Sequence, residues 1–215
     1  MSYGFLDIAR TPSVRAVQAE MGSAHVFDHF QGDRAFDAFT RHEMDFIAAR
    51  DSFYMASVSE TGWPYVQHRG GPAGFLTILD ERTLAFADYR GNRQYISTGN
   101  LRANDRVALI LMDYTRQMRL KIYARVEFLP VEAESALAGE VLSADYRARP
   151  ERIVLLRLAA FDWNCPQHIT PRFTEDEIIE SLRGVRERLT GLEDENARLR
   201  AELALARRDN AEDRT

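Results

Sequence analysis

Hydrophobic and polar residues alternate in short runs through the middle of the chain, and turn residues separate the runs. This period-two pattern is typical of β-strands. Successive runs are joined largely by hairpin turns, with few intervening helices, such as a short one expected at 135–142, so an antiparallel arrangement is expected rather than βαβ units. The pattern therefore predicts a mainly β (α+β) fold built on an antiparallel barrel. The expected strands are 53–59, 64–69, 74–79, 83–88, 106–114, 119–129 and 152–161.

Helical patterns flank this region on both sides. Thr11 followed by Pro12 is an N-cap with proline at the first helical position, which predicts a helix to about Met21. Asp33 begins a second expected helix that ends near Arg50. Its expected buried face consists of Phe36, Phe39, Phe46 and Ile47. The expected organisation is a helical segment packing on the barrel at 1–50, the barrel itself at 51–173, and a C-terminal helix at 174–215.

The C-terminal helix carries a heptad pattern. With Leu182 at position a, Asn196 also falls at a, which is typical of a parallel two-stranded coiled coil whose register one buried asparagine fixes. The g and e positions carry opposite charges, as in Glu195 and Arg200. The alternative is a single amphipathic surface helix with a solvated charged face. The seam residues are Leu182, Val185, Leu189, Leu192, Asn196, Leu199, Leu203 and Ala206.

Composition excludes several function classes. The 28 basic and 33 acidic residues give a net charge of −5, which argues against nucleic-acid binding. No apolar run approaches the roughly 18 residues that a membrane span needs. The single cysteine, Cys165, excludes an internal disulfide and a cysteine-based zinc site, so we expect a cytoplasmic protein. Lys121 is the only lysine, and the other 27 basic residues are arginine. A bound phosphate must therefore rely mainly on arginine or backbone amides.

Histidine and cysteine provide only weak candidates for chemistry. His25 and His29 share a helical spacing, but no third ligand stands nearby in sequence, so no metal site is expected. Cys165 and His168 form a conceivable nucleophilic dyad, but Pro166 between them disfavours a direct contact.

Three polar clusters at the ends of expected strands are more informative. They are Gln67 to Gly71, Tyr89 to Gln94, and Arg116-Gln117. The second offers two arginines and a glycine just before an expected helical turn, an arrangement suited to an anion. An ordinary exposed loop is the alternative. In a barrel the three clusters can converge on one site.

These clusters carry a family resemblance that covers roughly residues 45 to 165. The chain resembles the pyridoxamine 5'-phosphate oxidase-like FMN-binding split barrels in GWPYVQHRGG, in LAFADYRGNRQYIS followed by NLRANDRVALIL, and in TRQMRLKIYARVEFL. The arginine and histidine signature that true pyridoxamine phosphate oxidases have near the C-terminus is missing. The chain instead reads WNCPQHITPRF before the coiled coil, so the resemblance implies the flavin rather than that substrate.

The resemblance implies ten FMN-binding residues. Arg93 would hold the phosphate, and Gln94 replaces the lysine that often follows it, which makes phosphate affinity depend more steeply on Arg93. Gln117 would contact the flavin from the neighbouring hairpin. The partner subunit commonly closes the site where Trp163 and Asn164 stand. The remaining residues line the flavin ring and ribityl chain: Gln67, His68, Arg69, Ala87 and Asp88.

The expected function is an FMN-dependent oxidoreductase that transfers a hydride or electrons to an unidentified small molecule, with NADH or NADPH as a candidate reductant. No catalytic residue is assigned, although His68 is a candidate. The alternative is a non-catalytic flavin-binding sensor or storage module dimerised by its coiled coil, and a weaker one is binding of haem or a deazaflavin. The family resemblance and the heptads both imply a homodimer, and the resemblance places the flavin at its subunit interface.

Overall fold

The structure, a computed structural model, describes residues 3–27, 38–131, 136–142, 146–163 and 167–212. It forms two compact units, Met1–Thr170 and Pro171–Thr215. The helical segment at the N-terminus therefore belongs to the same unit as the strands.

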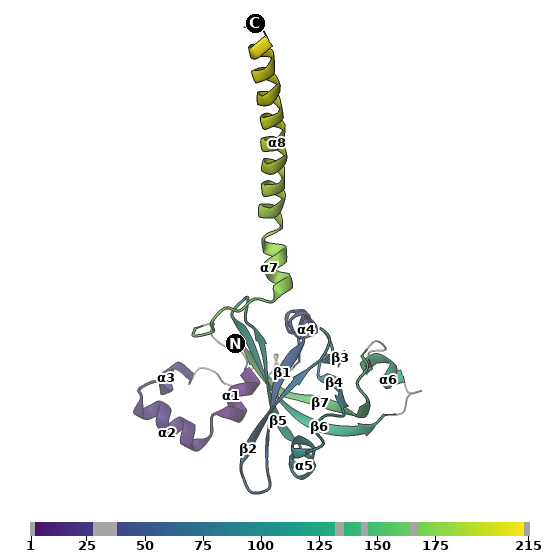
Figure 1. The fold of residues 1–215 in the computed structure, drawn as a ribbon. Coiled ribbons are helices and arrows are strands. Elements are labelled where there is room, and N and C mark those ends of the chain that lie inside the picture. The colour runs from purple at the N-terminus through teal and green to yellow at the C-terminus, as the bar shows by residue number, and fades with distance from the viewer. Residues whose placement is uncertain (1–2, 28–37, 132–135, 143–145, 164–166, 213–215) are drawn as a thin grey trace. The chain divides into compact units, whose positions relative to one another are not determined.

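The described strands form one antiparallel sheet with the order β2-β1-β5-β6-β7-β4-β3 (Figure 1). The expected hairpins β1–β2, β3–β4 and β5–β6 are present, and β7 joins β6 to β4. The antiparallel α+β prediction is thus confirmed, with β2 and β3 at the two ends of the strand order. The strands are β1 Ser52–Val58, β2 Pro64–Gly70, β3 Thr77–Asp80, β4 Thr83–Tyr89, β5 Arg106–Asp113, β6 Met118–Pro130 and β7 Pro150–Trp163.

Helices pack around the sheet. In Figure 1 the first three lie together on one flank of the sheet and α6 lies on another. Lys121 helps to hold α1, because its ammonium lies 2.6 Å from the Asp162 carboxylate and 4.6 Å from the Phe5 ring centroid. The only lysine thus has a structural contact. The helices are α1 Tyr3–Ala9, α2 Pro12–Glu20, α3 Ala24–Phe27, α4 Arg41–Ala48, α5 Ile96–Ala103, α6 Ala136–Val141, α7 Glu175–Ser181 and α8 Arg183–Glu212.

Two elements begin later than the pattern predicts. Helix α4 begins at Arg41, because Thr40 and Glu43 form a capping box that ends the preceding extended segment. Asp33 and Phe36 lie outside the described residues. Strand β3 begins at Thr77 because Gly74 adopts a φ of 82°, which belongs to a turn and not to a strand.

The main core lies on the inner face of the curved sheet, where Phe53, Met55, Leu109 and Phe86 are buried. Strand β4 is buried on both faces, because Ala85 and Ala87 on its other side pack with α6. On the outer face of the sheet, β2, β1 and β5 present exposed apolar side chains. These are Val58, Tyr54, Val66 and Ile110.

Candidate functional site

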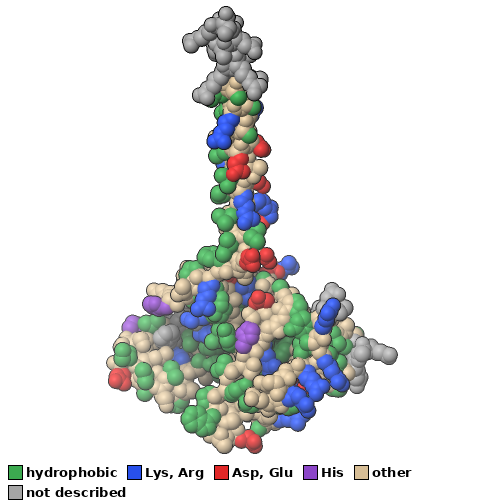
Figure 2. All heavy atoms as spheres, in the orientation of Figure 1, with side chains coloured by type: hydrophobic (Ala, Val, Ile, Leu, Met, Phe, Trp, Pro, Cys, Tyr) green, Lys and Arg blue, Asp and Glu red, His purple; other side chains and the backbone are tan. Residues whose placement is uncertain are grey.

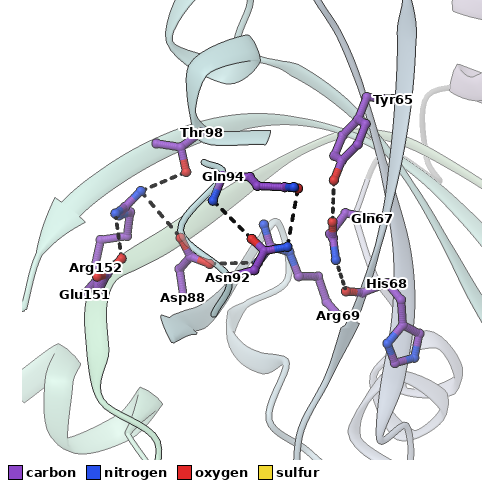
Figure 3. A network of polar contacts seen from close by, with 10 residues as sticks. All are labelled: Tyr65, Gln67, His68, Arg69, Asp88, Asn92, Gln94, Thr98, Glu151 and Arg152. Atoms are coloured by element: carbon purple, nitrogen blue, oxygen red, sulfur yellow. Dashed lines mark hydrogen bonds and ion pairs between the residues drawn. The ribbon is translucent and has the colours of Figure 1, made fainter. Parts of the chain in front are cut away.

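The inner face of the end strand β2 is polar, whereas that of its neighbour β1 is largely apolar. Tyr65, Gln67 and Arg69 alternate along β2 and are half-buried, opposite Ser57, Met55 and Phe53 of β1. The Tyr65 hydroxyl donates to Gln67 Oε1 at 2.6 Å, and Gln67 Nε2 donates to the His68 carbonyl at 3.2 Å (Figure 3). These bonds set the orientation of the Gln67 amide.

A buried carboxylate links this strand to the end of β4. Asp88 is 7% exposed and follows Phe86 on the same face of β4, which places it at the end of the main core. Arg69 Nη1 donates to Asp88 at 2.8 Å, and Arg152 Nη1 of β7 lies 3.6 Å from the other carboxylate oxygen. Burial of this carboxylate is tolerated because two guanidinium groups neutralise it.

The loop after β4 leads into α5 through two left-handed residues, Arg93 with φ 64° and Tyr95 with φ 52°. Asn92 Oδ1 accepts a hydrogen bond from the Gln94 backbone N–H at 3.1 Å, which stabilises the turn. No side chain caps the N-terminus of α5. Its first amides, including those of Ser97 and Thr98, are therefore available to another acceptor.

These elements surround a hollow of about 150 Å³ that opens to solvent. It is lined by the inner face of β2, the loop after β4 and the first turn of α5. Arg152 lies beside it, donating to the Thr98 hydroxyl at 2.8 Å and to Glu151 at 3.2 Å. The ten residues in Figure 3 show this polar wall. Five of the expected flavin-site residues line the hollow: Gln67, Arg69, Asp88, Arg93 and Gln94.

Four of the other expected residues do not bring their side chains to this hollow. His68 lies on the outer face of β2 and packs edge-on against Tyr54. Ala87 faces α6 across β4, and Gln117 Nε2 donates to the Ile169 carbonyl at 2.6 Å. Trp163 packs against α4. Asn164 lies outside the described residues. The cluster at Arg116-Gln117 therefore does not converge with the other two in this hollow.

Trp163 instead takes part in a separate polar contact. Its indole Nε1 donates to Glu43 Oε1 at 2.7 Å, and its ring packs 4.7 Å from that of Phe46. Burial alone would raise the pKa of Glu43, but hydrogen bonds from Thr40 and Trp163 outweigh it and hold the pKa below its ordinary value. This contact joins the start of α4 to the end of β7.

Other classes of site find no support in the described part of the chain. Within it, no group of three histidine, cysteine or acidic side chains is placed to hold a metal. The pair of His25 and His29 and the dyad of Cys165 and His168 each include a residue outside the described ranges. No helix within those ranges has both the length and the apolar character that crossing a bilayer requires.

The sequence model of the pyridoxamine 5'-phosphate oxidase family matches residues 39–163. This match spans more than half of the chain and contains the whole hollow. The chain belongs to this family. No curated protein matches it at the sequence level.

Several solved structures are similar to this chain only at a distance. A putative pyridoxamine 5'-phosphate oxidase from Lactobacillus delbrueckii is 20% identical, with a TM-score of 0.46, covering 60% of this chain and 96% of its own. A general stress protein 26 relative from Clostridium acetobutylicum is 12% identical (TM-score 0.43; 64% and 94% covered). An FMN-binding protein from Syntrophomonas wolfei is 11% identical (TM-score 0.41; 71% and 97% covered).

Sequence reasoning missed several residues that line or adjoin the hollow. Tyr65 shares the face of Gln67 and Arg69 by the period of two, so strand alternation was a sufficient signal for it. Arg152 and Glu151 come from β7, which pairs with the end of β4 through Arg152 and Asp88. No local motif marks that pairing.

Proposed function

We propose that this chain binds FMN in the hollow, with the phosphate held by Arg93 and the free amides of α5. The observation that carries the proposal is the meeting of an arginine turn, an uncapped helix N-terminus and the polar face of β2 around one space. Donors of both kinds are suited to a phosphate monoester, because guanidinium groups and helix-terminal amides bind phosphate oxygens.

The charges around the hollow fit a phosphate dianion. Arg69 and Arg93 line the hollow together with Asp88 and Glu151. Arg90 and Arg152 lie beside it, in ion pairs with Glu151 and Asp88, so the hollow and its edge carry four positive and two negative charges. The surplus of two matches the charge of about −2 that a phosphate monoester carries near neutral pH. In addition, Arg69 Nε is buried without a hydrogen-bond partner in the described structure, which leaves a donor for a ligand.

We further propose that the protein is an FMN-dependent oxidoreductase. Bound FMN supplies hydride or electron transfer, so the chain needs no acid or base of its own for that step. Its residues bind and orient the ligand: Arg93 and α5 fix the phosphate, while the Gln67 amide, held by Tyr65, offers a hydrogen-bonding edge along β2. The substrate stays unassigned, and the sequence lacks the signature for pyridoxamine phosphate.

We propose that a second copy of the chain completes the site. The outer face of β2, β1 and β5 carries Tyr54, Val66 and Ile110 at 40 to 60% exposure, and it adjoins an apolar groove that Ala56 and Tyr123 help to line. A face of this kind is typical of a protein interface. Gln117 and Trp163 lie outside the hollow of their own chain, so we propose that they reach a flavin held by the partner.

The proposal is tested by an absorption spectrum of the purified protein after incubation with FMN and removal of free ligand. A flavin absorption band at about 450 nm that remains with the protein supports flavin binding. Protein without the band contradicts it, and a haem or deazaflavin spectrum would reassign the ligand.

Turnover is tested separately on the FMN-loaded protein by anaerobic mixing with NADH or NADPH. Bleaching of the flavin band at a rate compatible with turnover supports the oxidoreductase. A persistent yellow colour with both nucleotides favours the alternative of a flavin-binding module without turnover, a role that the heptad tail would also suit.

A further inference from the structure

The second unit is dominated by one long helix with an uncovered apolar seam. Helix α8 has 30 residues, so it is about 45 Å long. The described seam side chains from Val185 to Leu203 are 44 to 64% exposed in the single chain, apart from Asn196, which is also exposed. Figure 2 shows hydrophobic side chains along this helix. A narrow seam at heptad spacing is shaped to pack against another helix.

We propose that α8 forms a parallel two-stranded coiled coil with α8 of a second copy of this chain. Charge complementarity is the first argument that the helix packed against α8 belongs to a second copy of this chain. In a parallel pair, each g residue faces the e residue five positions further along its partner. Arg188 then faces Glu193, and Glu195 faces Arg200. A third such pair is Glu202 with Arg207. Each pair is opposite in sign, and each occurs twice because the interface is symmetric.

Asn196 selects the parallel orientation and the register. In a parallel pair of identical chains it meets its own copy in the same a layer, where the two amides can hydrogen-bond to each other. In an antiparallel pair, a layers face d layers, and the Asn196 amide would lie against an apolar residue without a partner. A buried unpaired amide is strongly unfavourable, so the antiparallel arrangement is disfavoured.

The tail also has no net charge. From Leu182 onward it carries eight basic and eight acidic residues, whereas the whole chain has a net charge of −5. Two copies of the tail can therefore associate without net repulsion. The seam lies in a different unit from the sheet face that is proposed to complete the flavin site.

Disulfide trapping in the full chain tests the proposal. In a Cys165→Ser background, Val185→Cys places a thiol at d, near the start of the seam, and Glu187→Cys places the control thiol at f, on the outer side. The expected result, in a glutathione redox buffer, is at least fivefold more covalent dimer for the d variant than for the f variant. In an antiparallel pair the two copies of residue 185 would lie about 30 Å apart and could not be bridged.

Leu189→Cys, at the seam position a, repeats the measurement should Val185→Cys fold poorly, because its two copies would lie about 15 Å apart in an antiparallel pair. Equal trapping at d and f would show only that two tails lie near each other, and it would contradict packing through the seam. Absence of trapping at both seam positions would overturn it as well, whether the true partner is an antiparallel copy or another protein.

A charge swap on the Val185→Cys protein tests the pairing of g with e. Glu195 and Arg200 are the better pair to use, because Glu202 already lies 3.6 Å from Arg198 within the helix. Arg200→Glu alone should lower the trapped fraction relative to monomer by roughly threefold or more. Adding Glu195→Arg should restore it. A double variant that stays as low as the single variant would contradict parallel g-to-e pairing.

Discussion

At the scale of single residues, the wall of the hollow depends on one buried carboxylate. Asp88 has a side-chain exposure of 9%, and Arg69, its nearer partner, has 22%. Removing the carboxylate would leave two guanidinium groups facing each other with little solvent between them. Breaking such a pair by removing one partner is far more costly than removing an exposed pair.

We therefore expect Asp88→Ala to lower the free energy of unfolding by about 2–4 kcal/mol. Urea denaturation followed by tryptophan fluorescence measures this, because both tryptophans lie in the first unit. Asp105→Ala is the matched control: its pair with Arg125 is exposed, and we expect a loss below about 1 kcal/mol. Equal losses for the two variants would contradict the structural role of Asp88.

Glu43 provides a pH-dependent prediction. Its pKa in the folded protein lies below its ordinary value of 4.5, so its ionised form stabilises the fold above that pH, and this contribution is lost as pH falls through the lowered pKa. Glu43→Gln should destabilise the first unit near neutral pH, and the difference from wild type should shrink below about pH 4.5. Urea titrations at several pH values measure it. Glu60→Gln, which changes an exposed carboxylate in the β1–β2 turn, is the control. A pH-independent difference for Glu43→Gln would contradict the assignment.

At the scale of elements, the sequence predicted the strands because alternation is a local property. The same alternation puts Gln67 and Arg69 on one face of β2 and His68 on the other, although the sequence-based prediction assigned all three to the flavin. Which face is internal depends on packing with β1 and β5, and no local pattern shows it. Arg152 was missed for a similar reason, since only the antiparallel pairing of β4 with β7 brings it to Asp88.

Irregular backbone accounts for other differences between the expected and observed elements. Gln117 has a φ of 54°, and its amide is used by the Ile169 carbonyl. Its motif was visible in the sequence, but this contact depends on a distant segment. The start of β3 was placed too early because the effect of Gly74 on the backbone depends on its conformation, which periodicity does not specify.

The glycines of α8 give a prediction for this element. A Cβ added at Gly184 or Gly191 would meet no atom within 4 Å, and both positions fall at c, outside the seam. Gly191→Ala should stabilise the helix by about 1 kcal/mol, because alanine has the higher helix propensity. Far-UV circular dichroism during thermal unfolding measures this.

Gly74→Ala is the contrasting variant. Its φ is positive and the added Cβ would lie 3.3 Å from the Ala48 carbonyl oxygen, so we expect destabilisation of the first unit. A Gly191→Ala protein with unchanged or lower helix stability would contradict an open, regular α8.

At the scale of the whole molecule, the two units have different proposed functions. The family match and the hollow lie in the first unit, and the heptad seam lies in the second. Deleting residues 182–215 should therefore leave a protein that still binds FMN and still dimerises through its sheet face. Light scattering and the flavin spectrum measure the two properties.

In the deletion protein, Val66→Glu should place a charge on the exposed face of β2 and give a monomer with weakened FMN binding. Glu60→Gln in the same background is the control, because it changes the turn beside β2 without adding charge to the face. A deletion protein that is monomeric yet keeps its flavin would contradict a site shared between two chains.

The most direct test of the account compares the affinities of FMN and riboflavin, which differ only in the phosphate, for wild type and Arg93→Ala. We expect wild type to bind FMN at least tenfold more tightly than riboflavin, because charge-assisted hydrogen bonds contribute about 1.5–3 kcal/mol each. In Arg93→Ala this preference should fall by about tenfold, with riboflavin affinity nearly unchanged. An Arg93→Ala protein that retains the wild-type preference for FMN would contradict a phosphate held at the start of α5.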